Sequence, residues 1–404
     1  RMVAIAFLGV NTGIGLCYGT FGTLVLHIER HFHADRAAVS LALALTAIMH
    51  GVLAPVIGRM IGRYRIRSLM LAGALLAGAG FLLLAPSGSP LALLLIYGAM
   101  IGPGTALMGV IPALTLVNNW YGKGQGKMAG IVMMPLALTV APMIVARLLP
   151  YLGFRGVVIG TAALYLLPAF WMIVDKPGQV GLRPIGAEEE GEAPPPQSLA
   201  DAPAKPPLTI GALWRDPIFL LMVTGTGIIA GAGVAKSAHF LPVLVEQGWD
   251  MDRAALLLSI SGATGMAGSL LFGALADRFS ASLALALNGL LQAVIWLILV
   301  LPSPFALLVV DAVVIGACGT GLMSAKAVLV TRIFGRENYA YVAGISAFTT
   351  LPFVGALPPV VGLLRDSSGS YALPFLTIIG GFVLAAICFL LVIRAEMRAR
   401  AGVA

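Results

Sequence analysis

The sequence predicts an all-α membrane protein with twelve transmembrane helices, arranged as two six-helix bundles that repeat one another. Its composition is 59% hydrophobic and 10% charged, with a mean hydropathy of +0.98, whereas a soluble domain carries roughly 25% charged residues. Twelve apolar segments are long enough to cross a bilayer, which takes about 20 residues in a helix. One polar stretch separates the first six segments from the last six.

The twelve segments are too long for barrel strands and do not alternate between apolar and polar residues. Helices, which satisfy their backbone hydrogen bonds internally, are the remaining way to span a bilayer. The segments are 3–28, 36–60, 66–86, 89–117, 127–150, 153–174, 217–246, 253–275, 281–300, 304–333, 338–364 and 372–395.

The polar stretch at 175–207 is rich in proline and glycine and carries four closely spaced glutamates. Such a composition cannot bury a core and is typical of a flexible linker. We therefore predict an N-terminal bundle over 1–174, a cytoplasmic linker over 175–216 and a C-terminal bundle over 217–404.

The net charge of +8 is distributed unevenly across the predicted membrane. We count 17 lysines and arginines on the side that carries both termini and the linker, five on the other side and three within helices. Because cytoplasmic loops carry an excess of Lys and Arg, both termini are predicted to be cytoplasmic, in a cell inner (plasma) membrane. The basic charge is thereby explained without a nucleic-acid partner; the lipid bilayer is the expected partner.

No pattern for catalysis or for a cofactor is found. Cys17, Cys318 and Cys388 lie within apolar segments and show neither disulfide nor metal-ligand spacing. No nucleotide-binding loop or hydrolase elbow occurs in a suitable context. The protein is therefore not expected to be an enzyme, no cofactor or metal is expected, and an ion or substrate gradient is the expected energy source.

The two halves share short motifs at a nearly constant offset. "GRMIGR" at 58–63 corresponds to "GALADR" at 273–278, an offset of 215. "WYGKGQGKMAGI" corresponds to "IFGRENYAYVAGI", so that Tyr121 falls on Phe334 and Gly130 on Gly344, at offsets of 213 and 214. Parallel repeats of this kind build transporters that rock around a site near the bilayer midplane.

These motifs resemble the major facilitator superfamily. "GALADR" is similar to the signature loop of that superfamily, which implies a gating role for Asp277 and Arg278, whereas the first copy has Gly62 in place of the usual Asp. Within the superfamily, the chain most resembles the monocarboxylate transporter and oxalate–formate exchanger branch, on the pieces "NNWYGKGQGKMAGI", "GFRG", "DKPGQVGLRP", "HFLPVLVEQG" and "LRDSSGSYALPF". The resemblance implies the major facilitator fold and alternating access.

With the twelve predicted segments numbered as helices in chain order, helix 7 is 217–246, helix 8 is 253–275 and helix 10 is 304–333. Helix 8 departs from the monocarboxylate carriers. Gly265 and Ser269 stand where the resemblance implies an Asp and an Arg that holds the substrate carboxylate. A lactate-like substrate held in the usual way is therefore not supported. Our hypothesis is that the positive charge lost from helix 8 is supplied by helix 7.

Two lysines within helices that the resemblance assigns to the cavity are candidate anion-binding residues. Lys236 lies near the middle of helix 7, and His239 follows three residues later on the same face. Lys326 in helix 10 lies about 9 Å from the end of its helix. The alternatives are structural pairing of Lys236 with an acid and snorkelling of Lys326 to the interface.

Asp311 and His50 are candidates for proton coupling. Asp311 is the only acid deep in a predicted helix, and it can instead pair with Lys236. Fifteen residues, or about 22 Å of helix, separate Asp311 from Lys326, so these two cannot pair. His50 has the intrinsic chemistry of a proton carrier, although helix packing is the alternative.

Neutral residues complete the candidate site: Asn11, Tyr18, Ser269 and Phe348, for each of which helix packing is the alternative. The predicted function is a secondary active transporter that moves a small organic anion by alternating access, with a proton or a counter-anion as coupling partner. We expect a monomer. The alternatives are a proton-driven exporter of drug-like or neutral compounds and, from another class, a non-transporting membrane sensor or scaffold.

Overall fold

The computed structural model describes residues 2–122, 124–174 and 208–401. These residues form helices and short connections, with no strand among them. The predicted linker at 175–207 lies outside the described residues. The end of the predicted linker, at 208–216, contains the short helix α10 (Ile210–Leu213).

The first half of the described chain, called the N-half here, runs from α1 to α9. Its elements are α1 (Met2–Val10), η1 (Asn11–Leu16), α2 (Cys17–Phe32), α3 (Arg36–Ile61), α4 (Ile66–Leu84), α5 (Pro90–Ile96), η2 (Tyr97–Ile101), α6 (Gly102–Met108), α7 (Val110–Trp120), α8 (Gln125–Val132) and α9 (Leu136–Val174). The C-half comprises α11 (Pro217–Glu246), α12 (Met251–Arg278), α13 (Ala281–Ile295), α14 (Leu297–Val300), α15 (Phe305–Phe334), α16 (Tyr339–Ser368) and α17 (Ala372–Ala401).

Eleven stretches of the described chain are long and apolar enough to cross a membrane. One of them, Gln125–Leu167, contains the fifth predicted segment and the start of the sixth. Within it, α9 joins two helices across Gly153, whose φ of 63° is not helical. Glycine adopts that conformation without a Cβ clash, so the chain turns there between two spans. All twelve predicted segments therefore coincide with helical structure.

Local sequence explains where many of these helices begin and end. Asp35, Asp216, Asp250 and Ser280 accept hydrogen bonds from backbone N–H groups in the first turns of α3, α11, α12 and α13. These are preferred N-cap residues because their side chains satisfy donors that the helix leaves unpaired. Gly369, with a φ of 72°, ends α16, as is typical of a C-terminal glycine.

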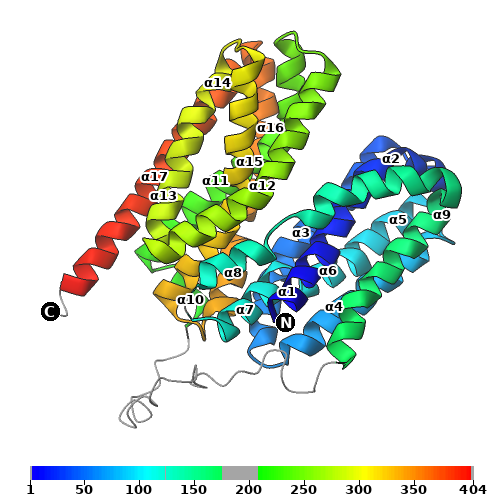
Figure 1. Ribbon diagram of the computed structural model, residues 1–404, viewed down its shortest axis with the longest axis horizontal. Helices are drawn as coiled ribbons and strands as arrows, with labels where there is room; N and C mark the ends of the chain where they lie inside the picture. Colours follow the sequence, from blue (N-terminus) through cyan, green and yellow to red (C-terminus); the bar gives the residue numbers. More distant parts are fainter. Residues whose placement is uncertain (1, 123, 175–207, 402–404) are drawn as a thin grey trace.

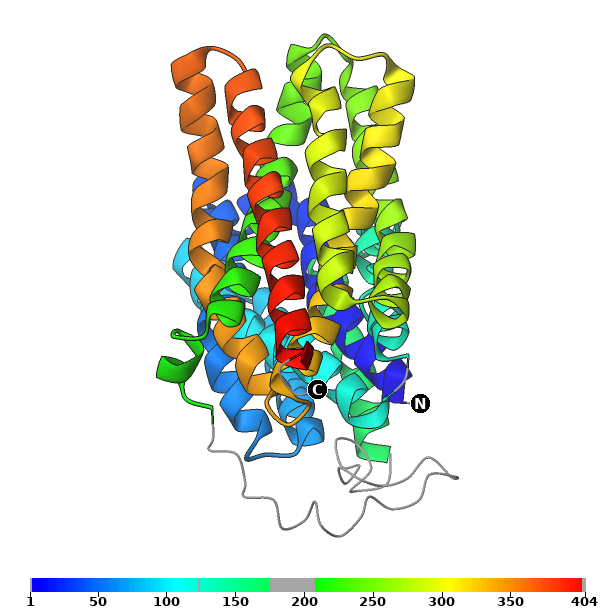
Figure 2. The ribbon, with the colours of Figure 1, turned by 90° about the vertical axis from the view of Figure 1, so that its left-hand side faces the viewer.

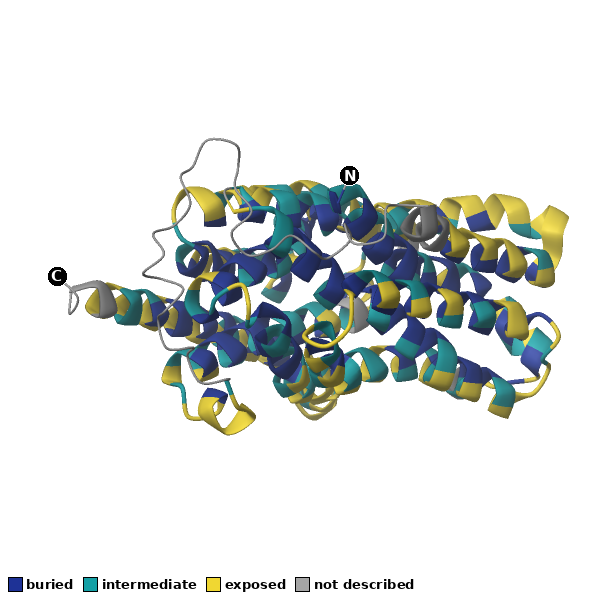
Figure 3. Ribbon diagram, turned by 90° about the horizontal axis from the view of Figure 1, so that it is seen from below, coloured by how far each residue is buried: buried dark blue, intermediate teal, exposed yellow. Residues whose placement is uncertain are grey.

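The two halves meet at one end and diverge toward the other (Figure 1). The start of α1, the end of α9 and the start of α11 lie at the end where the halves meet, which we call the linker side; Figure 2 shows the end of α17 there as well. The opposite end is called the far side. Residues facing the interior of each half are buried, and the exposed residues cover the outside (Figure 3). Large apolar side chains such as Leu91 and Val294 are exposed there, as expected for a surface covered by lipid.

Glycines bring the two halves into backbone contact on the linker side. A Cβ added at Gly126 or Gly130 of α8 would meet backbone atoms of Gly273 or Ser269 in α12. In the same way, Gly58 of α3 faces the backbone of Ala340 in α16, and Gly344 of α16 faces Ala54. The two contacts are related by the repeat, because Gly126 lies 214 residues before Ala340 and Gly58 lies 215 residues before Gly273.

Candidate functional site

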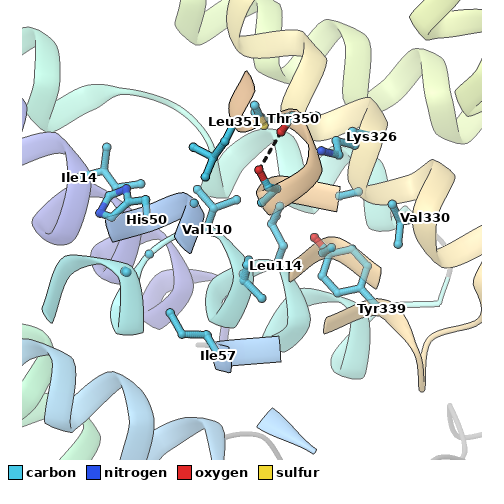
Figure 4. A pocket seen from close by; sticks show the side chains of 18 residues that line it. Ile14, His50, Ile57, Val110, Leu114, Lys326, Val330, Tyr339, Thr350 and Leu351 are labelled. Carbon is cyan, nitrogen blue, oxygen red and sulfur yellow. Dashed lines mark hydrogen bonds between the residues drawn. The ribbon is translucent and has the colours of Figure 1, made fainter. Parts of the chain in front are cut away.

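A cavity of about 240 Å³ lies between the halves (Figure 4). Residues of η1, α3, α6 and α7 line it from the N-half, and residues of α15 and α16 line it from the C-half. Most of its wall is apolar, including Ile14, Ile57, Val110, Leu114, Val330 and Leu351. The break between α6 and α7 at Gly109, whose backbone is not helical, places Val110 and Ile111 in this wall.

Lys326 of α15 is the charged residue in the cavity wall. Figure 4 shows its side chain on the C-half side of the cavity, opposite His50 of α3. Within the described part of the chain, the ammonium of Lys326 forms no ion pair and donates no hydrogen bond. The hydroxyl of Thr350, also in the wall, donates to the carbonyl of Ala347 at 2.9 Å. Lys326 is thus a cation without a protein counter-charge in a mostly apolar cavity.

His50 is held by Thr105 of α6. The two side chains are 2.8 Å apart, Nε2 to Oγ1, and the Thr105 hydroxyl donates its own hydrogen to the carbonyl of Ile101 at 2.8 Å. That hydroxyl therefore accepts from Nε2, which leaves Nδ1 of the neutral ring as an acceptor. The ring of Tyr18 packs edge-on to His50 at a centroid distance of 6.4 Å. Tyr18 and His50, predicted separately, are neighbours on the N-half.

Asn11 lies outside the cavity wall, with its amide engaged by the backbone. Its Nδ2 donates to the carbonyls of Phe7 and Met134 at 3.1 Å each, and its Oδ1 accepts from Ala137 N–H at 2.8 Å. These bonds join the π-helix η1 to the break between α8 and α9. Both ends of the Asn11 amide are thus engaged by backbone groups, which gives Asn11 a structural role in this conformation.

Lys236 of α11 is buried inside the C-half and does not line the cavity. Its Nζ donates to Ser261 Oγ of α12 at 2.5 Å and lies 5.0 Å from the centre of the Phe240 ring. Asp311 of α15 is fully buried, and neither of its carboxylate oxygens has a hydrogen-bond partner among the residues that the structure describes. The two residues are close enough for their charges to interact, but the described structure contains no ion pair between them.

His239, three residues after Lys236, is turned into the C-half. Its Nε2 donates to the carbonyl of Pro358 at 3.0 Å, and its Nδ1 lies 3.2 Å from the Tyr371 hydroxyl. Burial and the nearby Glu246 raise the pKa of the Tyr371 phenol, so at neutral pH the hydroxyl keeps its proton and can donate to Nδ1. Both ring nitrogens are occupied, and His239 therefore does not act together with Lys236 in this conformation.

Ser269 and Phe348 also lie outside the cavity wall. Ser269 is fully buried where α8 crosses α12, and its hydroxyl donates to the carbonyl of Met266 at 2.9 Å. Phe348 is 41% exposed. The structure thus brings Lys326 and His50 together in the cavity wall, with Tyr18 beside His50, and places the other candidates elsewhere.

Asp277 joins the halves on the linker side. Its two carboxylate oxygens accept hydrogen bonds from the backbone N–H groups of Gly126 and Lys127, at 2.8 Å each. These donors belong to the first turn of α8, where a negative charge also interacts favourably with the helix dipole. Arg278 instead places its guanidinium 5.6 Å from the ring of Phe279.

The sequence interpretation missed a buried polar cluster between the halves. Asn118 of α7 donates to the hydroxyl of Thr331 in α15 at 3.0 Å, and Gln125 of α8 donates to the same hydroxyl at 2.9 Å and to the Asn118 carbonyl oxygen. Asn118 and Thr331 are 213 residues apart, which is the repeat offset. Residues equivalent in the two halves meet across the interface, so the offset itself was the signal that could have found this pair.

Comparison with known proteins identifies the architecture. The model of the Major Facilitator Superfamily matches residues 4–301 and 240–403. The chain belongs to the major facilitator superfamily. The crystal structure of the E. coli fucose:proton symporter superposes with a TM-score of 0.74 at 15% identity, covering 97% of this chain and 99% of that chain. The predicted fold class is therefore confirmed.

Curated members of the superfamily share sequence with this chain. Monocarboxylate transporter 11 of Mus musculus is 27% identical over 285 residues, which are 69% of this chain and 59% of that protein. An MFS-type efflux pump of Mycolicibacterium smegmatis is 29% identical over 252 residues, 58% of this chain and 54% of the pump. The monocarboxylate transporter among these relatives confirms the predicted resemblance to that branch. The major facilitator chain described here is an integral membrane transporter and not an enzyme.

Proposed function

We propose that this transporter moves a small organic anion, with one carboxylate and an apolar remainder, across the membrane by alternating access. The observation that carries the proposal is Lys326, a cation with no counter-charge among the described residues, in a largely apolar cavity between the two halves. The monocarboxylate transporters among the relatives support the substrate class.

The chemistry of the cavity favours one carboxylate over two. A charge away from water is unfavourable unless it is paired, and a substrate carboxylate would supply the missing partner of Lys326 through a charge-assisted hydrogen bond. The cavity wall offers no second cation, so a dicarboxylate would bring an unpaired negative charge. The apolar wall would hold the rest of the substrate, and a volume near 240 Å³ suits a small molecule.

This proposal changes the role given to Lys236. The hypothesis that α11 supplies the positive charge that the family resemblance implies for α12 assigned the substrate carboxylate to Lys236. In this conformation Lys236 bonds to Ser261 and lies outside the cavity wall. We therefore propose Lys326 as the principal carboxylate contact and His50, on the opposite wall, as a second polar contact.

The conformation is proposed to be closed on the cytoplasmic side and open outward. Backbone contacts at glycines, the Asp277 cap and the Asn118 cluster all join the halves on the linker side. The excess of Lys and Arg on that side supports its assignment as cytoplasmic, in a cell inner or plasma membrane. Release of the substrate to the cytoplasm would require these contacts to open while the far side closes.

A second candidate is export of drug-like or neutral compounds. The apolar wall of the cavity and the mycobacterial efflux pump among the relatives favour it. The unpaired Lys326 argues against a cationic drug. A non-transporting sensor, the third possibility from the sequence, differs from both because it predicts no saturable uptake.

Uptake into proteoliposomes tests the proposal. We expect saturable uptake of labelled monocarboxylates with apolar tails, competed weakly by dicarboxylates and by neutral analogues. Lys326→Ala should raise KM by roughly 10- to 100-fold, because a hydrogen bond to a charged group contributes about 1.5–3 kcal/mol. Lys326→Arg, which keeps the charge, should retain a larger part of the affinity. Lys127→Ala, which removes an exposed lysine outside the cavity, is the matched control and should leave KM unchanged.

Two results would contradict the proposal. Unchanged monocarboxylate affinity in Lys326→Ala would remove this lysine from the site. Uptake of neutral compounds in preference to all anions would favour the exporter instead.

A further inference from the structure

We propose that Asp311 is the proton-binding group of this transporter and that Lys236 moves between Ser261 and Asp311 as the proton binds and leaves. This inference rests on the proposed anion transport and goes beyond it, because the proposed function leaves the coupling partner open between a proton and a counter-anion. It also places the proton at a site separate from the substrate cavity.

The first observation is the carboxyl group itself. Asp311 is fully buried and both of its oxygens lack a hydrogen-bond partner among the described residues. An ionised carboxylate held in this way has a desolvation cost of several kcal/mol. The conformation described here is therefore the one that accommodates the neutral, protonated acid.

The second observation is the position of Lys236. Its ammonium donates to the Ser261 hydroxyl at 2.5 Å, although the carboxyl group of Asp311 is near enough to interact with its charge. An ionised Asp311 would be the stronger partner for an ammonium than a neutral hydroxyl. The bond to Ser261 is thus the arrangement expected when Asp311 is protonated.

Close packing of α12 on α15 keeps the two alternative partners of Lys236 together. A Cβ added at Gly316 of α15 would meet the Ser261 carbonyl, and Thr320 of α15 donates to the Gly265 carbonyl of α12 at 2.5 Å. Gly316 follows Asp311 by five residues, or about 7.5 Å along the helix. A lysine side chain can span such a separation by changing rotamers, without a shift of the helices.

Few other ionisable groups surround this site. The helices α13 and α14, which pack against α15, contain no acidic or basic residue. The helix α12 carries such residues only at its two ends. On α11, His239 is engaged by Pro358 and Tyr371, and on α15 itself Cys318 is the other titratable group near Lys236. The helices α8 and α16 also contact α15. The ionisable residue of α8 is Lys127. Those of α16 lie at its two ends: Tyr339 and Tyr341 on the linker side, and Arg365 and Asp366 on the far side.

The charge balance of the switch is simple. Loss of the proton from Asp311 to water leaves a carboxylate, which then forms an ion pair with Lys236, so the site changes from a net charge of +1 to zero. Rebinding of the proton breaks the ion pair and returns Lys236 to Ser261. Because Asp311 and Lys326 lie about 22 Å apart along α15, the proton and the anion bind at different levels of one helix.

The test uses the full chain in proteoliposomes with a monocarboxylate that the wild-type protein transports. Asp311→Asn should keep counterflow of the labelled substrate within about twofold of wild type and lose accumulation driven by an imposed proton gradient. Asp252→Asn, an exposed carboxylate in the first turn of α12, is the matched control and should keep both. Wild-type accumulation in Asp311→Asn would overturn the inference.

A second variant covers the case in which Asp311→Asn does not fold. Ser261→Ala keeps Asp311 titratable but removes the partner of Lys236 in the protonated state. The ion pair is then favoured, so the pH midpoint of uptake should move by about one unit to lower pH, the size expected for one hydrogen bond. An unchanged midpoint with intact counterflow would contradict the switch.

The wild-type protein separates the two proposals. Intact counterflow together with accumulation that does not respond to an imposed proton gradient would reject the proton site and leave anion transport standing. No uptake or counterflow of any monocarboxylate would reject the proposed function itself.

Discussion

Polar residues inside the helical bundles differ in whether the protein already supplies their hydrogen-bonding partners. Asn11 and His239 have their hydrogen-bonding atoms engaged by backbone or by Tyr371. Among the described residues, Lys326 and Asp311 have no such partner. A polar group in the interior without a partner in one conformation is expected to find one in another step of the cycle, whereas a satisfied group is expected to hold the structure together.

Substitution of Asn11 tests this distinction. Asn11→Ala would leave the Met134 carbonyl and the Ala137 N–H without their side-chain partner, so we expect a loss of roughly 1–3 kcal/mol in the free energy of unfolding. Thermal unfolding in detergent measures this loss, and uptake measures KM, which should stay within about twofold of wild type. A stable variant with a strongly raised KM would instead make Asn11 a substrate contact.

At the scale of helices, the repeat is asymmetric in one feature that matters for gating. Asp277, at the end of α12, caps the first turn of α8 in the other half. The equivalent position at the end of α3 is Gly62, and the first turn of α16 receives no side-chain cap from its own Asn338. Arg59 instead lies 5.9 Å from the ring of Tyr341. One of the two contacts that close the linker side therefore has a carboxylate latch and the other does not.

Gly62→Asp should supply the missing latch. The backbone there has a φ of −72°, and an added Cβ would meet only the Arg59 carbonyl at 3.5 Å, an ordinary contact. We expect the new carboxylate to stabilise the conformation that is closed on the linker side, and therefore to raise the thermal stability and lower the transport rate. Asp277→Asn should weaken the existing latch and shift both quantities the other way. Equal behaviour of the two variants would contradict the asymmetry.

At the scale of the whole molecule, the pseudo-symmetric interface depends on glycine. A side chain at Gly126 would meet the backbone of Gly273, whereas a Cβ at Gly160 of α9 meets nothing within 4 Å. Gly126→Val should prevent the linker side from closing and so abolish net uptake. Gly160→Val is the matched control and should keep uptake near the wild-type rate. Normal uptake in Gly126→Val would show that the halves need not approach this closely during transport.

The contacts between the two halves also explain the position of the cavity. Contacts at both glycine pairs hold the linker ends of α3, α8, α12 and α16 together, and the halves diverge toward the far side (Figure 1). The cavity occupies the space just inside these contacts, with walls from both halves. A relative movement of the halves therefore changes the cavity and the gate at once, which is the physical requirement of alternating access.

The sequence by itself determined the membrane class, the positions of the twelve segments and the superfamily. Apolar length and charge are properties of the chain alone, because the bilayer acts on each segment in the same way. It also identified every ionisable group whose role is now in question, since charges at this depth are rare.

Only the tertiary structure decided which of these groups share a site. Lys236 and Lys326 look alike in the sequence, yet one bonds to Ser261 inside the C-half and the other lines the cavity. Ser269, which stands where the family resemblance implied an arginine, is buried where α8 crosses α12, and Asn118 meets Thr331 from the other half. The direction in which a side chain points depends on how its helix is rotated and packed against helices distant in sequence. When apolar residues cover every face of a helix, its pattern of hydrophobic residues does not encode that rotation.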